Sequence, residues 1–325
     1  LVPALDTKEE YLRAMIDSCL AQTYGNFELI LADASKEDQV EKVVKTYKDP
    51  RIRYRRLKQN TGISANTGQA LMYATGDYVG LLDHDDVLTP DALFEMAACI
   101  EKYRKEQIQL QLLYSDEDKC DQHQQRYFEV NRKPDFNLDL ILSNNYICHF
   151  MVIKRQLIQE LGFRSVCDGA QDYDLVLRCL GRILGKENQA HRTGQGEGNP
   201  VTLPVAHIPR VLYHWRCHTQ STAQNPASKQ YAYDAGKRAV EDFLRLRGWR
   251  AEVKHLRHLG FYRIEYRNNV LTHRPDLAAV GGLTAYHGKV AGGTYKGQPL
   301  VYAGYMNRMD LYQNTKLLDI RNMAV

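Results

Sequence analysis

Three aspartates within four residues follow a short apolar run, and their spacing is suited to binding a metal ion. The run from Tyr78 to Leu82 has the length and composition of a buried strand, and Asp83, Asp85 and Asp86 come directly after it. Carboxylates this close repel one another, and a cation among them would relieve that repulsion. In an extended chain Asp83 and Asp85 point to the same side. We therefore predict a divalent metal site here, with a solvated acidic turn as the alternative.

Alternating strands and helices would place this acidic cluster at one edge of a sheet. We expect strands at 27–31, 52–57, 78–82 and 110–115, and helices at 9–22, 38–47, 63–74 and 90–106. Such alternation predicts an α/β fold, with a mostly parallel sheet and helices on both faces. Ligands of these sheets bind outside the carboxyl ends of the strands. Asp33, Asn60 and the acidic cluster all follow strands at that edge.

The later sequence continues this pattern and then changes character. We expect strands at 150–153 and 205–213 and helices at 155–161, 172–180 and 228–247, with a Gly- and Gln-rich surface loop at 181–200. Short β-like pieces rich in glycine and tyrosine follow Gly248. We therefore predict two parts, a catalytic domain over 1–250 and a β-rich C-terminal segment over 251–325.

Composition and charge exclude several classes of protein. The 325 residues carry a formal charge of +4, which is too weak to indicate nucleic-acid binding, although contact with an anionic membrane surface stays open. The seven cysteines are scattered without zinc-site spacing, which is typical of reduced thiols in the cytoplasm. No apolar run is long enough to cross a bilayer, and no signal peptide is recognisable. Leu1-Val2-Pro3 has the pattern of a strand's end, so we expect the sequence to begin inside its first strand.

Several further motifs occur in a characteristic order. They are YLRAMIDSCLAQTY at 11–24, Asp33-Ala34-Ser35, NTGISANTGQA at 60–70, the run 75–86, YSDEDK at 114–119, NYICHF at 145–150, GAQDYDL at 169–175 and the segment 213–221. Together they resemble a family 2 glycosyltransferase of the nucleotide-sugar-binding GT-A fold. The resemblance covers 1–250 and is strongest to bacterial members that build rhamnose-containing or other cell-surface polysaccharides.

The resemblance implies a donor site that is assigned residue by residue. Asp83 and Asp85 match the Asp-x-Asp that holds Mn or Mg against the donor diphosphate, and the late segment that would return a histidine to the metal contains His214 and His218. The residues that match the nucleotide-sugar site are Asp33, Asn60, Gly62, Asn66 and His84. A UDP-sugar or a dTDP-sugar would fit this pattern.

The resemblance also implies an acceptor side. Asp172, at the start of an apolar helix, matches the general base, and Asp116, Gln171 and Trp215 would lie near the acceptor. Many relatives carry Glu where this chain has Gln171. A carboxylate must take the proton of an acceptor hydroxyl, and a metal can neutralise the departing diphosphate. One base without a second nucleophilic carboxylate predicts a single displacement with inversion. The acceptor would be a glycan or a lipid-linked glycan, the enzyme would act in the cytoplasm or at the inner face of the membrane, and a homo-oligomer stays open.

Two other functions compete with this interpretation. Asp83-His84-Asp85-Asp86-Val87 also fits a haloacid-dehalogenase-like phosphohydrolase, in which Asp83 would be the covalent nucleophile. In that family the motif stands on the first strand, whereas two strand–helix units precede it here. A non-catalytic nucleotide-sugar-binding module is the other alternative, and the presence of Asp83, Asp85 and Asp172 argues against it.

The C-terminal segment weakly resembles the acceptor-side half of a second glycosyltransferase module. Its strand-like stretches are 274–282 and 317–323, and it has neither an Asp-x-Asp nor a Gly-x-x-Asp helix start. We therefore predict no separate activity for 251–325.

Overall fold

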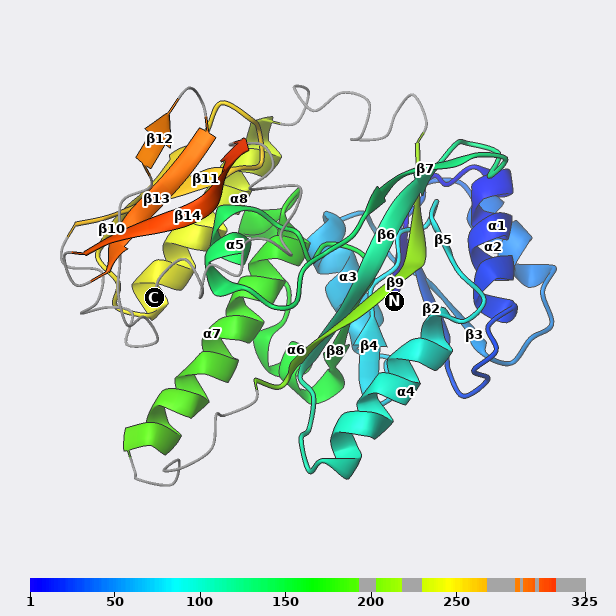
Figure 1. The fold of residues 1–325 in the computed structure, drawn as a ribbon. Helices are drawn as coiled ribbons and strands as arrows, with labels where there is room; N and C mark the ends of the chain where they lie inside the picture. Colours follow the sequence, from blue (N-terminus) through cyan, green and yellow to red (C-terminus); the bar gives the residue numbers. More distant parts are fainter. Residues whose placement is uncertain (193–202, 218–229, 268–283, 287–288, 296–297, 308–325) are drawn as a thin grey trace.

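A computed structural model describes residues 1–192, 203–217, 230–267, 284–286, 289–295 and 298–307 of the protein (Figure 1). The first elements in chain order are β1 Val2–Ala4, α1 Glu9–Leu20, β2 Leu29–Asp33, α2 Gln39–Lys45, β3 Ile52–Arg56, α3 Ile63–Leu71, β4 Tyr78–Gly80, β5 Val87–Leu88 and α4 Ala92–Lys105. They are followed by β6 Leu112–Cys120, β7 Tyr127–Asn131, α5 Leu138–Ser143, β8 Met151–Lys154, α6 Arg155–Leu161, a 3-10 turn at Ser165–Cys167, α7 Gln171–Arg192, β9 Val205–Arg216 and α8 Gln230–Leu246. The described C-terminal strands are β10 Ala251–His255, β11 Tyr262–Tyr266, β12 Thr284–Tyr286, β13 Lys289–Tyr295 and β14 Gln298–Asn307.

The central sheet is mixed rather than mostly parallel, which corrects one part of the predicted fold class. Strands β1, β2 and β3 pair in parallel, but β8 is antiparallel to both β4 and β6, and β5 is antiparallel to β9. Strand β6 pairs in parallel with β9. An apolar run has the same pattern in either direction, so the local sequence could not report the reversal of β8.

Backbone hydrogen bonds at Leu1 join the two groups of strands into one surface. The Leu1 nitrogen donates to the Gly80 oxygen at 2.7 Å, and the Leu82 nitrogen donates to the Leu1 oxygen at 3.1 Å. The order across the sheet is therefore β3-β2-β1-β4-β8-β6-β9-β5, with β7 paired to β6. Figure 1 shows β2 and β3 at one end of the molecule and the C-terminal hairpin β10–β11 with α8 at the other.

Two hydrophobic cores cover the two faces of the sheet, as an α/β fold requires. Because side chains alternate along a strand, Ile30 and Ala32 of β2 belong to one core and Leu29 and Leu31 to the other. The first core contains residues of α3, α5, α6, α7 and α8, and the second contains residues of α1, α2 and α4. The predicted α/β layers are confirmed.

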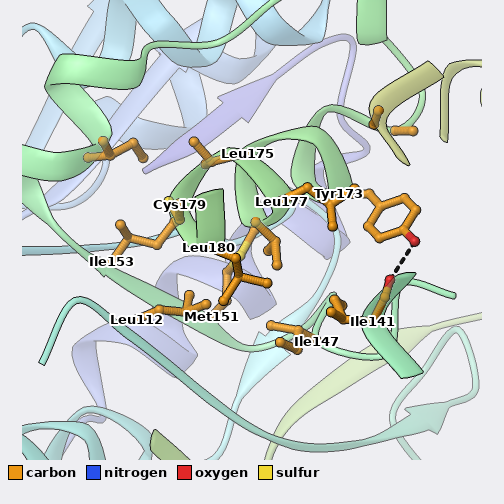
Figure 2. Close-up of a cluster of buried hydrophobic side chains, with 14 of the residues drawn as sticks. Leu112, Ile141, Ile147, Met151, Ile153, Tyr173, Leu175, Leu177, Cys179 and Leu180 are labelled. Carbon is orange, nitrogen blue, oxygen red and sulfur yellow. Dashed lines mark hydrogen bonds between the residues drawn. The ribbon is translucent and has the colours of Figure 1, made fainter. Parts of the chain in front are cut away.

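Helix α7 is fixed firmly to the sheet. Its buried side chains Leu177 and Leu180 belong to the same core as Met151 and Ile153 of β8 (Figure 2). The Tyr173 hydroxyl donates to the Ile141 carbonyl at 2.5 Å, which links the start of α7 to α5. The helix continues to Arg192, so the loop predicted from 181 is wrong over 181–192, and 193–200 lie outside the described residues.

The described part of the C-terminal segment is β-rich, as expected. Strands β10 and β11 form an antiparallel hairpin, and β12, β13 and β14 form a separate antiparallel sheet. Val253 and Tyr262 of the hairpin are buried in the core that contains Phe243 and Trp249. The predicted strand-like stretches 274–282 and 317–323 lie outside the described residues.

No helix in the described ranges is both long and apolar enough to cross a membrane.

Candidate active site

The carboxylates of the acidic turn after β4 differ in burial. Asp86 is 1% exposed and accepts hydrogen bonds from the Tyr213 hydroxyl at 2.5 Å and from the Arg216 backbone nitrogen at 2.7 Å. It therefore anchors the turn to β9. Arg216 also donates through Nε to the backbone oxygen of Asp85 at 2.5 Å.

Asp83 lies on the open side of this turn. Its side chain is 47% exposed. Partial burial raises the pKa of the Asp83 carboxyl above its ordinary value; His149 opposes this rise, and the negative charges of Asp85 and Asp172 add to it. A divalent cation would stabilise the crowded carboxylates, so the oxygen donors of this turn fit Mn or Mg. Among the residues that the structure describes, no group of three or more His, Cys, Asp or Glu could hold a metal ion by itself.

Asp172 lies in the first turn of α7 and faces the loop before β8. Its Oδ2 accepts hydrogen bonds from Asn145 Nδ2 at 2.8 Å and from Cys148 Sγ at 2.7 Å. Burial, followed by the charge of Asp172, raises the pKa of Cys148 to about 12. The thiol is therefore protonated at neutral pH and acts as a donor rather than a nucleophile.

His149 stands between the acidic turn and β6, and its position was not predicted from the sequence. Its Nδ1 is hydrogen-bonded to Glu117 at 3.1 Å, and its Nε2 lies 3.9 Å from an Asp83 carboxylate oxygen. The imidazole stacks on the Tyr213 ring with centroids 4.7 Å apart and an interplanar angle of 14°. The Tyr213 hydroxyl also donates to Asp86, so one aromatic side chain contacts both His149 and the acidic turn.

A buried lysine completes the charges around His149. The side chain of Lys133 is fully buried. Its Nζ donates to the His149 carbonyl and lies 3.5 Å from a Glu117 carboxylate oxygen. Burial acts to raise the pKa of Glu117, but Lys133 and His149 outweigh it and lower that pKa to about 2. Glu117 is therefore ionised at neutral pH and can fix the orientation of the imidazole.

These residues line one cavity. Asp172, Cys148, His149, Glu117 and Trp215 all border a cavity of about 930 Å³. This volume falls within the range of small-molecule sites. Another cavity of about 940 Å³ lies between β2 and β4 and contains none of the predicted site residues.

The predicted residues of the nucleoside side are held by contacts within the protein. Asp33 is fully buried and accepts hydrogen bonds from the Tyr54 hydroxyl at 2.7 Å and from Arg56 at 2.9 Å. His84 Nδ1 is hydrogen-bonded to the Thr7 hydroxyl at 3.0 Å, which joins the acidic turn to the loop after β1.

The loop before α3 is closed by its own side chains. Asn60 Oδ1 accepts from Gly62 N at 3.0 Å and from Asn66 Nδ2 at 2.9 Å. Gly62 has a φ of +95°, and a side chain there would collide with the Asp168 carboxylate. Asp168 also accepts from Ser64 N at 3.2 Å.

The structure separates the three acceptor-side predictions. Trp215 borders the cavity, whereas Gln171 accepts from Gly169 N at 2.9 Å and is not among the lining residues. Asp116 is 2% exposed and bonds to His207 at 2.8 Å and to Lys133 N at 2.9 Å. It is not among the residues that line the cavity, whereas its neighbour Glu117 is.

The structure describes one of the two predicted histidine ligands. His214 Nδ1 is hydrogen-bonded to Asp118 at 2.5 Å, and its ring packs against Tyr127 with centroids 4.5 Å apart. His218 lies outside the described residues.

Comparison with known proteins identifies relatives of this chain. A family model described as Glycosyl transferase family 2 matches residues 1–162. The chain is 31% identical to the O-antigen biosynthesis protein RfbC of Myxococcus xanthus, over 78% of this chain and 18% of that protein. It is 38% identical to the uncharacterized protein y4gI of Sinorhizobium fredii, over 75% of this chain and 25% of that protein. The chain thus spans a quarter or less of the length of these two relatives.

Solved structures share the same fold. The structure of S. aureus TarS in complex with UDP-GlcNAc aligns with a TM-score of 0.52 and 14% identity, covering 75% of this chain and 66% of that chain. The TarS complex with UDP aligns with a TM-score of 0.52 and 16% identity, covering 75% and 64%.

Proposed function

From the premise that the chain carries a glycosyl transferase family 2 domain over residues 1–162, we propose that it is an inverting, metal-dependent glycosyltransferase. It transfers a sugar from a nucleotide-diphosphate donor to a hydroxyl of a glycan acceptor. The family assignment and the GT-A fold agree with the resemblance predicted from the sequence motifs. Specificity for a rhamnose-containing glycan stays a prediction.

The observation that carries the proposal is that Asp172 and His149 border one cavity, and that His149 Nε2 lies 3.9 Å from an Asp83 carboxylate oxygen. Asp172 borders the cavity, and its negative charge contributes to the raised pKa of Asp83. A general base and the binding site of the leaving group must lie near each other when one hydroxyl displaces one diphosphate. The positions of the acidic turn and the start of α7 are consistent with this requirement, although Asp83 and Asp172 are 89 positions apart in the sequence.

The residues of the chain would act in one displacement. The acceptor hydroxyl attacks the anomeric carbon, its proton passes to Asp172, and the bond from the sugar to the diphosphate breaks. Asn145 and Cys148 hold one carboxylate oxygen of Asp172, which keeps the other oxygen turned toward the substrate. Asp83 and Asp85 would hold a divalent ion, which would neutralise charge on the departing diphosphate.

The relatives support the classes of donor and acceptor. The TarS complexes contain UDP and UDP-GlcNAc, which favours a UDP-sugar over a dTDP-sugar here. RfbC is named as an O-antigen biosynthesis protein, which supports a cell-surface glycan as acceptor. The seven free cysteines support action in the cytoplasm, as either a free or a membrane-associated enzyme.

The phosphohydrolase alternative has less support than the transferase. Asp83 follows β4, the fourth strand of the chain, rather than the first, and the family model that matches is a glycosyltransferase. An experiment can distinguish a non-catalytic module from a transferase, because a non-catalytic module would bind the donor without turnover.

The test combines donor binding with turnover. We would measure thermal stabilisation by a panel of UDP- and dTDP-sugars with Mn or with a chelator, and then release of the nucleotide diphosphate. Stabilisation is expected from one donor in Mn only, since a ligand that binds the folded state raises its stability. Asp172→Asn should retain this stabilisation and lose about 10²- to 10⁴-fold in rate. Retention of the wild-type rate by Asp172→Asn would refute the assigned base.

A further inference from the structure

The cavity at Asp172 continues to the C-terminal hairpin. Leu259, Gly260 and Phe261, in the turn between β10 and β11, border the same cavity as Asp172. The turn is closed by hydrogen bonds from Leu256 N to Phe261 O at 2.9 Å and from Phe261 N to His258 O at 3.2 Å. The hairpin is therefore part of the wall of the site and not a separate appendage.

The position of this wall is fixed by packing against α8. Tyr262 is 3% exposed, and its hydroxyl donates to the Tyr233 carbonyl at 2.8 Å. Gly236 of α8 leaves room for that hydroxyl, since a side chain at this position would collide with it. Tyr233 borders the cavity as well. The shape of the cavity thus depends on contacts between α8 and the hairpin.

Two walls of different chemistry border the cavity. One wall contains Glu117, Asn144 and Asn145, and the other contains Leu259, Phe261 and Tyr262. A sugar ring has hydroxyl groups at its edge and carbon-bound hydrogens on its faces. A polar wall can bind the hydroxyls while an aromatic wall covers the apolar face of the ring.

The polar wall has acceptor atoms without a donor. The Oδ1 atoms of Asn144 and Asn145 are buried and have no hydrogen-bond partner in the described part of the chain. A buried acceptor without a donor costs about 1–3 kcal/mol. Both residues border the cavity, so a hydroxyl-bearing ligand would reach these atoms after rotation of the side-chain amides, whereas a hydrocarbon chain brings no donor.

We propose that this cavity is an acceptor site for a carbohydrate chain of two or more rings, and that the β10–β11 turn binds the ring next to the one being extended. The inference rests on the function proposed above. A volume of about 930 Å³ is at the upper end of the range for small-molecule sites, so the cavity has room beyond the ring at Asp172. Leu259 and Phe261 then determine acceptor specificity and take no part in the chemistry.

Equilibrium binding to the full chain tests this site without turnover. The probes are glucose, galactose, rhamnose and N-acetylglucosamine, with a di- and a trisaccharide of each, and farnesyl phosphate as a lipid. Trp215 borders the cavity, and the protein has two tryptophans, so Trp249→Phe leaves Trp215 as the single fluorescent reporter. Calorimetry on the wild-type protein gives the same affinities without that substitution.

At least one disaccharide or trisaccharide is expected to change Trp215 emission saturably and to bind tighter than its monosaccharide. Leu259→Asp and Phe261→Ala should weaken that oligosaccharide about tenfold, because each removes an apolar contact with the second ring, and should leave the monosaccharide unchanged. The matched controls are Leu246→Asp and Phe94→Ala, which alter exposed side chains outside the cavity and should change neither affinity.

Three results would overturn the inference. They are equal oligosaccharide affinity in the hairpin variants and the wild type, no saccharide response of Trp215 while a nucleotide sugar still binds, and a response to farnesyl phosphate alone. Absence of nucleotide-sugar binding in the thermal-shift panel would instead contradict the proposed function. The two failures are therefore distinguishable.

Discussion

Asp172 is held by two donors of unequal strength, and this inequality leads to a prediction. An amide N–H donates a stronger hydrogen bond to a carboxylate than a thiol does. Asn145→Ala should therefore reduce kcat roughly 10- to 100-fold, the size expected for a hydrogen bond to a charged group, and Cys148→Ala only a few-fold. Steady-state kinetics with a saturating donor would measure both.

The donor dissociation constant is the control for these two variants. It should stay unchanged, because both side chains contact the base and lie on the acceptor side of the acidic turn. Equal losses of kcat in Asn145→Ala and Cys148→Ala would contradict the proposed order of donors.

Neighbouring aspartates of the acidic turn should respond differently to substitution. Asp85→Ala is expected to abolish the metal dependence of donor binding and most of the affinity. Asp86→Ala should instead reduce the free energy of unfolding by about 1–3 kcal/mol, because the Tyr213 hydroxyl and the Arg216 N–H lose a buried acceptor. Calorimetric titration with Mn and urea unfolding would separate the two effects. A larger loss of stability in Asp85→Ala would reverse this assignment.

At the scale of the elements, the features that could be predicted from the sequence are those that local residue patterns determine. The Asp-x-Asp turn and the start of α7 were found because a strand end and a helix start have local patterns. Glu117 was not found, because β6 was expected to end at Ser115 and instead continues to Cys120. In the longer strand, whose pairing with β9 shifts register at Ser115–Glu117, Glu117 borders the cavity and Asp116 bonds to His207.

His149 and Cys148 were missed for a related reason. Both lie in the motif NYICHF, which indicated the resemblance to the family but not a role for either residue. Their contacts with Glu117 and Asp172 depend on the antiparallel pairing of β8 with β6. Strand direction and register across a crossover are set by tertiary packing, and short apolar runs do not encode them.

Glu28 links the start of β2 to the turn between α3 and β4, which gives a pH-dependent prediction. It accepts hydrogen bonds from Thr75 N at 2.6 Å and from Gly76 N at 3.1 Å, and it pairs with Arg53. Burial acts to raise the pKa of Glu28, but these hydrogen bonds outweigh it and lower the pKa to about 2. Glu28→Gln should therefore cost about 1–3 kcal/mol of unfolding free energy at pH 7.

The pH dependence follows from the direction of this shift. A carboxyl with a lowered folded-state pKa stabilises the protein above its unfolded value near 4.5, and the contribution disappears as the pH falls toward about 2. Urea unfolding of the wild type and Glu28→Gln at several pH values should show a difference that narrows over this range. Glu101→Gln, which alters an exposed carboxyl paired with Arg104, should leave the free energy of unfolding nearly unchanged throughout. A Glu28→Gln effect independent of pH would contradict the role of its charge.

At the scale of the whole molecule, the proposed catalytic groups lie where separate parts of the chain meet. The acidic turn comes from the first half, the base from α7, and one cavity wall from the hairpin after α8. The core that fixes α7 to the sheet also contains Val253 and Tyr262 of the hairpin. Positioning of Asp172 and closure of the cavity are thus coupled through one hydrophobic core, even though sequence patterns suggested a boundary at residue 250.

Two truncations test this coupling. A chain that ends at Arg267 retains the hairpin, and it should keep the melting temperature and the donor affinity of the full protein. A chain that ends at Arg250 loses Val253 and Tyr262, which are 1% and 3% exposed, and leaves the apolar surface around Trp249 and Phe243 uncovered. Removing two buried side chains from a packed core should cost roughly 3–5 kcal/mol or more. Differential scanning calorimetry would compare the three chains. Equal stability of the chain ending at Arg250 would mean that 251–325 are an independent unit, and α7 would then need no support from them.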